Sequence, residues 1–232
     1  MSLILQIETA TSSCSVALAK NGYVLAEKQV NQRNIHAEVI TLFIDELVGE
    51  AGVVYQDIDA VAVSSGPGSY TGLRIGVATA KGLCFALDKP LIAIETLEGM
   101  AYGIRKRGNY ITEGMLLCPM IDARRMEVFT AVFNSTGDRI EPTAAEIITE
   151  DSFSNLLKTN KILFFGDGAE KCRTVLDENP NAYFTSQFIN SAADLTECAL
   201  AKFKDQNFEA VAYFEPYYLK EFIVGKKAKP TI

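Results

Sequence analysis

The chain has 232 residues, 48% of them hydrophobic, which suits one large domain or two modest ones with a buried core. Its formal net charge of −7 argues against broad nucleic-acid binding through basic surface, although a local basic patch stays open. There is no apolar span of about 18 residues and no export leader, and the five cysteines are scattered. We therefore expect a soluble, cytoplasmic protein with reduced thiols and no membrane partner.

Three short antiparallel strands are predicted at the start of the chain. Residues 3–7 are apolar, and a tight polar turn follows them. Residues 14–19 then alternate between larger apolar side chains and small ones, and are predicted to run back as a second, antiparallel strand. Asn21-Gly22 is a strong hairpin signal that leads into a third strand over residues 23–30.

A helix is predicted next, over residues 35–49, with Asn34 as its cap. The only histidine, His36, lies in its first turn. One histidine cannot build a metal site unaided, and a general base needs a nearby nucleophile. We therefore expect a structural hydrogen bond from His36, with an exposed position as the alternative.

The most distinctive stretch, residues 60–87, is predicted to form a strand, a sharp turn and a helix. Residues 60–63 form a short β-branched run typical of a buried strand, and residues 64–69 place two glycines and a proline in a turn. Ser69 and Thr71 are both suited to cap a helix over residues 72–87, which is apolar or small nearly all round.

One face of that helix is formed mostly by glycines and small side chains, and we call it the low-relief face. Two glycines in a helix cost about 1 kcal/mol each relative to alanine, a cost usually accepted where another backbone comes close. The neighbour is either another helix of the same chain or another protein. The residues of this face are Gly72, Gly76, Thr79, Ala80 and Leu83.

The second half of the chain repeats the pattern of the first. Residues 115–121 form an apolar strand, residues 127–133 return, and residues 161–165 form a strand that a glycine turn joins to a helix from Ala169. A weak internal duplication explains this repeat. It predicts an α/β fold of two similar lobes, the actin-like ATPase architecture that sugar kinases and actin share within the ribonuclease H-like class.

The boundary between the lobes is predicted in the charged, glycine-containing stretch over residues 105–114. We assign residues 1–107 to an N-terminal lobe and residues 108–232 to a C-terminal lobe. The last segment is allowed to pack back onto the first lobe.

In this architecture a nucleotide lies between the lobes, so turns at the ends of strands are candidate phosphate contacts. The turn after Glu8, which includes Ser12, has neither glycine nor lysine and is a poor phosphate cradle. The turn Gly166-Asp167-Gly168 precedes a helix and suits an anion better, although a plain turn is the simpler interpretation. We expect no cofactor, apart from weak nucleotide binding or nucleotide shared with a partner.

Two basic features are open to more than one interpretation. Arg124 and Arg125 lie in a hairpin turn, where they either form surface ion pairs or contact a partner or a tRNA phosphate. The tail contains Lys226, Lys227 and Lys229, which we interpret mainly as a solubilising segment.

Three segments together carry a family resemblance: IETATSSCSVAL at residues 7–18, GPGSYTGLRIGVATAKGL at 66–83 and MIDARRMEVFTAVF at 120–133. In this order they resemble the TsaB (YeaZ) family, and the resemblance covers nearly the whole chain. It implies a cytoplasmic scaffold that acts with TsaD and TsaE. Together they attach a threonylcarbamoyl group to the adenosine next to the anticodon of tRNA. It also implies that the low-relief helix face binds TsaD, or a second copy of the chain in a homodimer.

The resemblance also bears on catalysis. The paralogous TsaD family has two metal-binding histidines on the helix that follows a strand like residues 90–94, and these positions fall on Thr96 and Met100. Neither side chain replaces an imidazole ligand. We therefore expect no metal site and no catalytic residue. The alternatives are an independent small-molecule kinase or ATPase, or a degenerate glycoprotease-like metallopeptidase, of the same fold.

Overall fold

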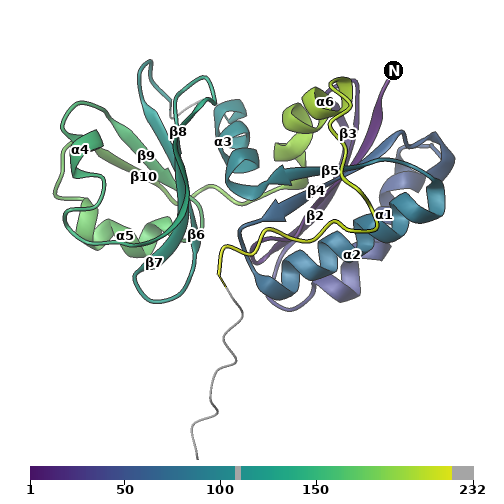
Figure 1. The fold of residues 1–232 in the computed structure, drawn as a ribbon, viewed down its shortest axis with the longest axis horizontal. Coiled ribbons are helices and arrows are strands. Elements are labelled where there is room, and N and C mark those ends of the chain that lie inside the picture. Colours follow the sequence, from purple (N-terminus) through teal and green to yellow (C-terminus); the bar gives the residue numbers. More distant parts are fainter. Residues whose placement is uncertain (108–110, 221–232) are drawn as a thin grey trace, which may run out of the picture.

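The computed structural model describes residues 1–107 and 111–220, which form two lobes placed side by side (Figure 1). The first lobe contains a five-stranded sheet in the order β3-β2-β1-β4-β5. Its strands are β1 (Leu3–Glu8), β2 (Ser13–Lys20), β3 (Tyr23–Asn31), β4 (Ala60–Gly66) and β5 (Leu91–Glu95). β1 pairs with β2 antiparallel and with β4 parallel, and β4 pairs with β5 parallel.

The second lobe contains a sheet of the same design, in the order β10-β9-β6-β7-β8. Its strands are β6 (Leu116–Asp122), β7 (Glu127–Phe133), β8 (Arg139–Ile147), β9 (Ile162–Phe165) and β10 (Ala182–Thr185). When β6 is matched with β1 and the others follow in chain order, the two sheets have the same strand order. The predicted duplication and the two-lobed α/β architecture are confirmed.

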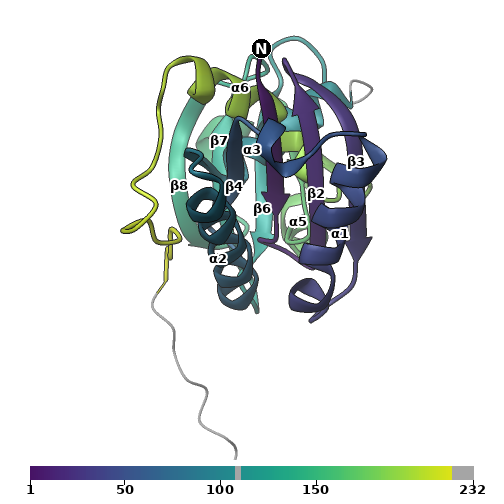
Figure 2. The same ribbon diagram turned by 90° about the vertical axis from the view of Figure 1, so that its right-hand side faces the viewer.

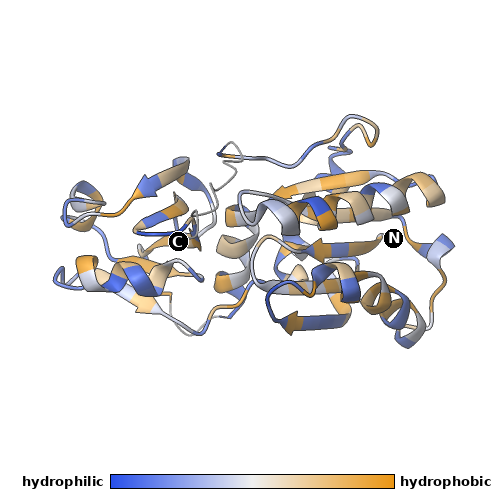
Figure 3. Cartoon of the chain, turned by 90° about the horizontal axis from the view of Figure 1, so that it is seen from below, coloured by the Kyte–Doolittle hydropathy of each residue, from blue (hydrophilic) through white to orange (hydrophobic). Residues whose placement is uncertain are grey.

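Helices cover both faces of the first sheet (Figure 2). α1 (His36–Glu50) and α2 (Tyr70–Leu87) pack on one face, whereas η2 (Ala192–Leu195) and α6 (Thr196–Lys204) pack on the other. β1 is therefore buried along its whole length, because both of its faces are covered. In Figure 3 the central strands carry hydrophobic colours accordingly.

The remaining helices are shorter or lie at the lobe boundary. They are η1 (Tyr55–Asp57), α3 (Thr96–Lys106), α4 (Ser154–Leu157) and α5 (Ala169–Leu176). Within the described ranges, no helix is long and apolar enough to cross a membrane.

α3 lies between the two lobes and packs against both of them. A Cβ added at Gly99 would lie 2.6 Å from Leu195, and one at Gly103 would lie 2.3 Å from the Asp194 carboxyl, so this side of α3 sits tightly against η2. The opposite side, including Met100 and Ile104, belongs to the hydrophobic core of the second lobe. The proposed lobe boundary after residue 107 directly follows this helix, and residues 108–110 lie outside the described part.

The end of the chain returns across the first lobe as an extended segment, residues 208–220, which we call the strap (Figure 1). Its hydrogen bonds to the lobe run from Glu209 N to Leu91 O (2.9 Å), from Lys81 Nζ to Phe214 O (2.8 Å) and from Tyr217 N to Ser65 O (2.7 Å). Leu219 packs on the core of the second lobe, and Lys220 forms an ion pair with Glu127 of β7. The strap thus connects the lobes on the surface.

Of the two predicted helix caps, one is confirmed and the other is wrong. Ser69 caps α2 as predicted, since its hydroxyl accepts a hydrogen bond from Gly72 N at 3.2 Å. Asn34 does not cap α1: the helix begins at His36 after Ile35, and Asn34 itself has a φ of 62°.

Candidate functional site

Glu8, at the end of β1, is a buried carboxylate within the first lobe rather than a ligand on an open surface. It is 2% exposed, and it accepts hydrogen bonds from Ala10 N (2.6 Å) and Ser64 Oγ (3.0 Å). Burial raises the pKa of Glu8 to about 7 and outweighs these two hydrogen bonds, and the charge of Asp194 adds to the increase. The carboxylate is used to hold the turn that follows it.

The turn after Glu8 packs directly against the backbone of α2. A Cβ added at Gly72 would lie 2.1 Å from Thr9 O, and one at Gly76 would lie 2.2 Å from Thr9 Oγ1. The predicted close approach of another backbone is present, but the backbone belongs to the same chain. The assignment of Gly72 and Gly76 to a partner surface was therefore wrong.

The rest of the low-relief face also turns inward. Ala80 is fully buried, and Leu83 packs against the core of the first lobe. Thr79 is half-buried and donates its hydroxyl hydrogen bond to Ile75 O at 2.9 Å. The side of α2 that faces solvent is instead formed by Arg74, Ala78, Gly82 and Phe85.

In the second lobe, the corresponding glycine turn packs on the end of β6. Gly166 has a φ of 103°, and a Cβ there would lie 2.4 Å from Met120 O. A Cβ at Gly168 would lie 2.9 Å from the carbonyl carbon of Ile121, and Asp167 accepts a hydrogen bond from Asp122 N at 3.0 Å. Both glycines are accounted for by this close packing.

The proposed nucleotide contacts do not form one cradle. Ser12 donates a hydrogen bond to Asn31 Oδ1 at 2.8 Å, within the first lobe. Over residues 1–107 and 111–220, no hydrogen bond links Ser12 or Glu8 to the glycine turn at 166–168. The structure therefore gives these residues local structural contacts, each within its own lobe.

His36 makes the structural hydrogen bond expected of it. It is buried, and its Nε2 lies 3.0 Å from Thr11 O in the turn after β1. The alternative of an exposed helix-start residue is wrong. This contact helps to fix the same turn that α2 covers.

Thr96 and Met100 are core residues at the lobe boundary. Thr96 Oγ1 accepts a hydrogen bond from Gly66 N at 3.1 Å. Met100 is 2% exposed, and its Cε would lie 2.6 Å from a Cβ at Gly166. Among the residues described, no group of three or more His, Cys, Asp and Glu side chains could hold a metal ion.

Arg124 and Arg125 occupy the turn between β6 and β7, with φ values of 72° and 50°. The neighbouring Asp122 accepts a hydrogen bond from Arg124 N at 2.9 Å and pairs with Lys171 of α5. Partial burial alone would raise the pKa of the Asp122 carboxyl. The hydrogen bonds from Lys171 and from Arg124 N, together with the charges of Lys171 and Arg33, have a larger combined effect, so the pKa of Asp122 lies below its ordinary value.

Five cations therefore surround this turn, and we call them the cationic lip: Arg33, Arg124, Arg125, Lys171 and Lys220. Lys171 also donates to Glu127 O at 2.7 Å, and Glu127 pairs with Lys220. Sequence reasoning found only the two arginines of the turn, because the other three come from distant segments. The basic tail at residues 226–229 lies outside the described part.

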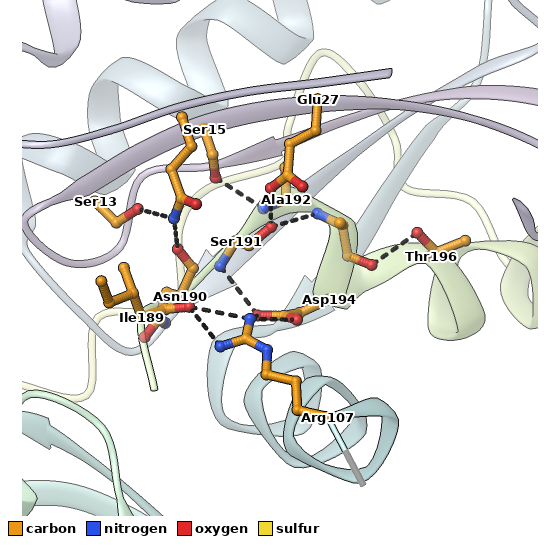
Figure 4. Close-up of polar contacts among 12 residues, drawn as sticks. Ser13, Ser15, Glu27, Arg107, Ile189, Asn190, Ser191, Ala192, Asp194 and Thr196 are labelled. Atoms are coloured by element: carbon orange, nitrogen blue, oxygen red, sulfur yellow. Dashed lines mark hydrogen bonds and ion pairs between the residues drawn. The ribbon is translucent and has the colours of Figure 1, made fainter. Parts of the chain in front are cut away.

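A polar joint ties the end of α3 and the segment around η2 to the first lobe (Figure 4). Arg107, at the end of α3, reaches both Asp194 oxygens at 2.9 Å and Ile189 O at 3.1 Å. Asp194 also accepts from Ser191 N at 3.0 Å. Burial raises the pKa of Asp194 to about 6, with Arg107 opposing the increase. No local sequence pattern predicted this joint.

Comparisons with known proteins agree with this architecture. Residues 23–222 match the family described as TsaD: tRNA N6-adenosine threonylcarbamoyltransferase. A solved structure from Pseudomonas aeruginosa, described as similar to peptidase YEAZ, has 26% identity and a TM-score of 0.80, over 95% of this chain and 100% of that chain. A dehydratase activator from Clostridium difficile, solved with bound ADPNP, shares the fold alone: 10% identity and a TM-score of 0.51, over 88% of this chain and 96% of that one.

A curated relative extends the match to the full length. The tRNA threonylcarbamoyladenosine biosynthesis protein TsaB of Escherichia coli is 31% identical over 232 aligned residues, which are 97% of this chain and 97% of that protein. The resemblance of the three segments at residues 7–18, 66–83 and 120–133 is thus confirmed by an independent match. This chain belongs to the TsaB family.

Proposed function

We propose that this chain is a non-catalytic subunit that activates a TsaD-type transferase, with TsaE as a third component. The reaction attaches a threonylcarbamoyl group to the adenosine next to the anticodon of tRNA. The observation that carries the proposal is the use of Thr96 and Met100 as core residues, at the two positions where the resemblance to the TsaD family implies metal-binding histidines. Thr96 is bonded to Gly66 N, and Met100 is packed under Gly166.

The docking surface that we propose for the transferase is the solvent side of α1 and α2. Phe85 of α2 is 86% exposed and Leu42 of α1 is 60% exposed, and a Cβ at Gly82 would meet nothing within 4 Å. Apolar side chains gathered on two neighbouring helices are typical of an interface. A second copy of the chain is expected to cover the same surface when the transferase is missing.

The direct test is reconstitution. Threonylcarbamoyl transfer to a tRNA transcript is measured with the TsaD and TsaE components, with and without this chain. We expect transfer to depend on the chain, whereas the pure chain alone binds no stoichiometric metal and hydrolyses no ATP. ATP turnover by the pure chain would instead support an independent kinase or ATPase.

The docking surface has its own test. Phe85→Asp places a charge on the proposed interface, so association with the transferase should weaken by about tenfold or more. Tyr23→Asp is the matched control, because Tyr23 is an aromatic residue that is 78% exposed on β3, away from α2. Equal affinities of the two variants for the transferase would contradict this surface.

A further inference from the structure

The cationic lip gathers five cations from four segments that are far apart in the sequence. Arg33 lies between β3 and α1, Arg124 and Arg125 in the β6–β7 turn, Lys171 on α5 and Lys220 at the end of the strap. The two lobes thus contribute to one surface, since Arg33 belongs to the first and the turn to the second. This concentration stands out in a chain whose formal net charge is −7.

The three arginines of the lip are available to a ligand. Lys171 and Lys220 are paired with Asp122 and Glu127. All three arginines are exposed, and none of them forms an ion pair with the described residues, although the charge of Arg33 acts on Asp122 from farther away. Exposed guanidinium groups without carboxylate partners suit the planar, bidentate recognition of phosphate oxygens.

The turn fixes the direction in which two of these arginines are presented. Both have positive φ values, a conformation that costs roughly 1–2 kcal/mol for a residue with a side chain. The turn is closed by hydrogen bonds from Ala123 N to Glu127 O (3.1 Å) and from Arg124 N to Asp122 Oδ1 (2.9 Å). The backbone of both arginines is therefore held before any ligand arrives.

We infer that the cationic lip binds the phosphodiester backbone of RNA, and that this RNA is the tRNA substrate. This inference rests on the proposed function. The cations lie on an exposed surface that crosses from one lobe to the other, a shape that fits an extended polyanion better than a single small phosphate. Phosphate contacts of this kind position a nucleic acid without reading its sequence.

The test compares two triple variants in the assembled complex with the transferase. Arg33→Gln, Arg124→Gln and Arg125→Gln together remove the three unpaired charges of the lip. The matched control combines Lys20→Gln, Lys158→Gln and Lys204→Gln, which removes three exposed charges elsewhere. The dissociation constant for a tRNA transcript is measured by fluorescence anisotropy at several salt concentrations, and melting curves establish that both variants fold.

We expect the lip variant to bind tRNA about tenfold or more weakly, and its log–log salt slope to fall by about 2 to 3, because each lost phosphate contact lowers the slope by about 1. The control should leave both quantities close to those of the wild type. Equal effects of the two variants would overturn the inference.

Two further outcomes also overturn it. If the lip variant loses affinity for the transferase while the remaining complex binds tRNA normally, the lip is a protein-binding surface. If it loses ATP binding but keeps its affinity for tRNA, the lip serves a small phosphate ligand. Failure of the wild-type chain to stimulate transfer would refute the proposed function. An unchanged KM for tRNA in a stimulated reaction would refute this inference alone.

Discussion

At the scale of single residues, Glu8 makes stability depend on pH. Its pKa of about 7 in the folded protein lies above the ordinary value of 4.5, so the folded state holds a proton that the unfolded chain has already lost. This carboxyl therefore favours folding fully below about pH 4.5, and its contribution is lost as the pH rises towards 7.

Glu8→Gln should remove most of this dependence, because a neutral amide keeps an acceptor for Ala10 N and Ser64 Oγ. Relative to the wild type, we expect the variant to gain about 2.5 kcal/mol of unfolding free energy between pH 5 and pH 8. Urea denaturation at the two pH values measures this. Equal pH dependence of the two proteins would mean that Glu8 is ionised in the folded state.

Two glycines of α2 provide a matched pair for the packing argument. Gly76→Ala places a Cβ 2.2 Å from Thr9 Oγ1, and we expect it to lower the unfolding free energy by about 1–3 kcal/mol. Gly82→Ala meets nothing within 4 Å, so the better helix propensity of alanine should raise stability by about 0.5–1 kcal/mol. Chemical denaturation of both variants would show opposite signs. A stable Gly76→Ala would show that Thr9 moves aside at little cost.

At the scale of elements, the strap stabilises the first lobe. Val211 and Phe214 pack against the core of that lobe, and Lys81 binds two strap carbonyls, those of Ala212 and Phe214. A chain that ends after Asn207 loses these contacts. We expect it to be less stable by about 2–4 kcal/mol than a chain that ends after Lys220.

Urea denaturation of the two truncated chains measures the contribution of the strap. Phe214→Ala in the longer chain should fall between them, because it removes one apolar anchor and leaves the backbone hydrogen bonds. Identical denaturation midpoints for all three proteins would show that the strap lies on the surface without stabilising it.

At the scale of the whole molecule, the lobes depend on each other for their cores. The first sheet needs η2 and α6 to cover Ile4, Ile92 and Ile94. α3 contributes its apolar side to the second lobe. The Arg107–Asp194 pair holds η2 against the end of α3, and the ion pair between Arg139 of β8 and Glu95 of β5 adds a contact between the lobes. A cut at the lobe boundary would therefore open both cores.

We predict that residues 1–107 expressed alone do not fold into a stable monomer. Their sheet would expose one apolar face, and α3 would expose another. Circular dichroism and size-exclusion chromatography of this fragment, beside the chain of residues 1–220, test the prediction. A monomeric fragment with a cooperative melting curve would contradict it.

The sequence predicted the architecture well because its signals were local. The strands of the first lobe were predicted from the alternation of larger and small side chains, the Asn21-Gly22 hairpin and the glycine turn before the long helix. The repeat of this pattern predicted the second lobe. β10 was missed, because its four residues, Ala182–Thr185, are too few to show a pattern. The short helix α4 was missed for the same reason.

The candidate site was less predictable, because it depends on contacts between distant segments. A helical wheel showed that Gly72 and Gly76 share a face, but not that Thr9 fills it. Arg107 and Asp194, which meet in the polar joint, are 87 residues apart, so no local pattern links them. The cationic lip likewise arises only after both lobes are assembled.

The closing of the first sheet by the end of the chain has a consequence for biosynthesis. The ribosome makes β1 to β5 first, but η2, α6 and the strap, which cover that sheet, are made last. During translation the apolar face around Ile4, Ile92 and Ile94 therefore stays exposed while the second lobe is synthesised, because η2 and α6 have not yet been made. We therefore expect nascent chains of this protein to expose a surface that chaperones bind, and premature termination after residue 191 to leave it uncovered permanently.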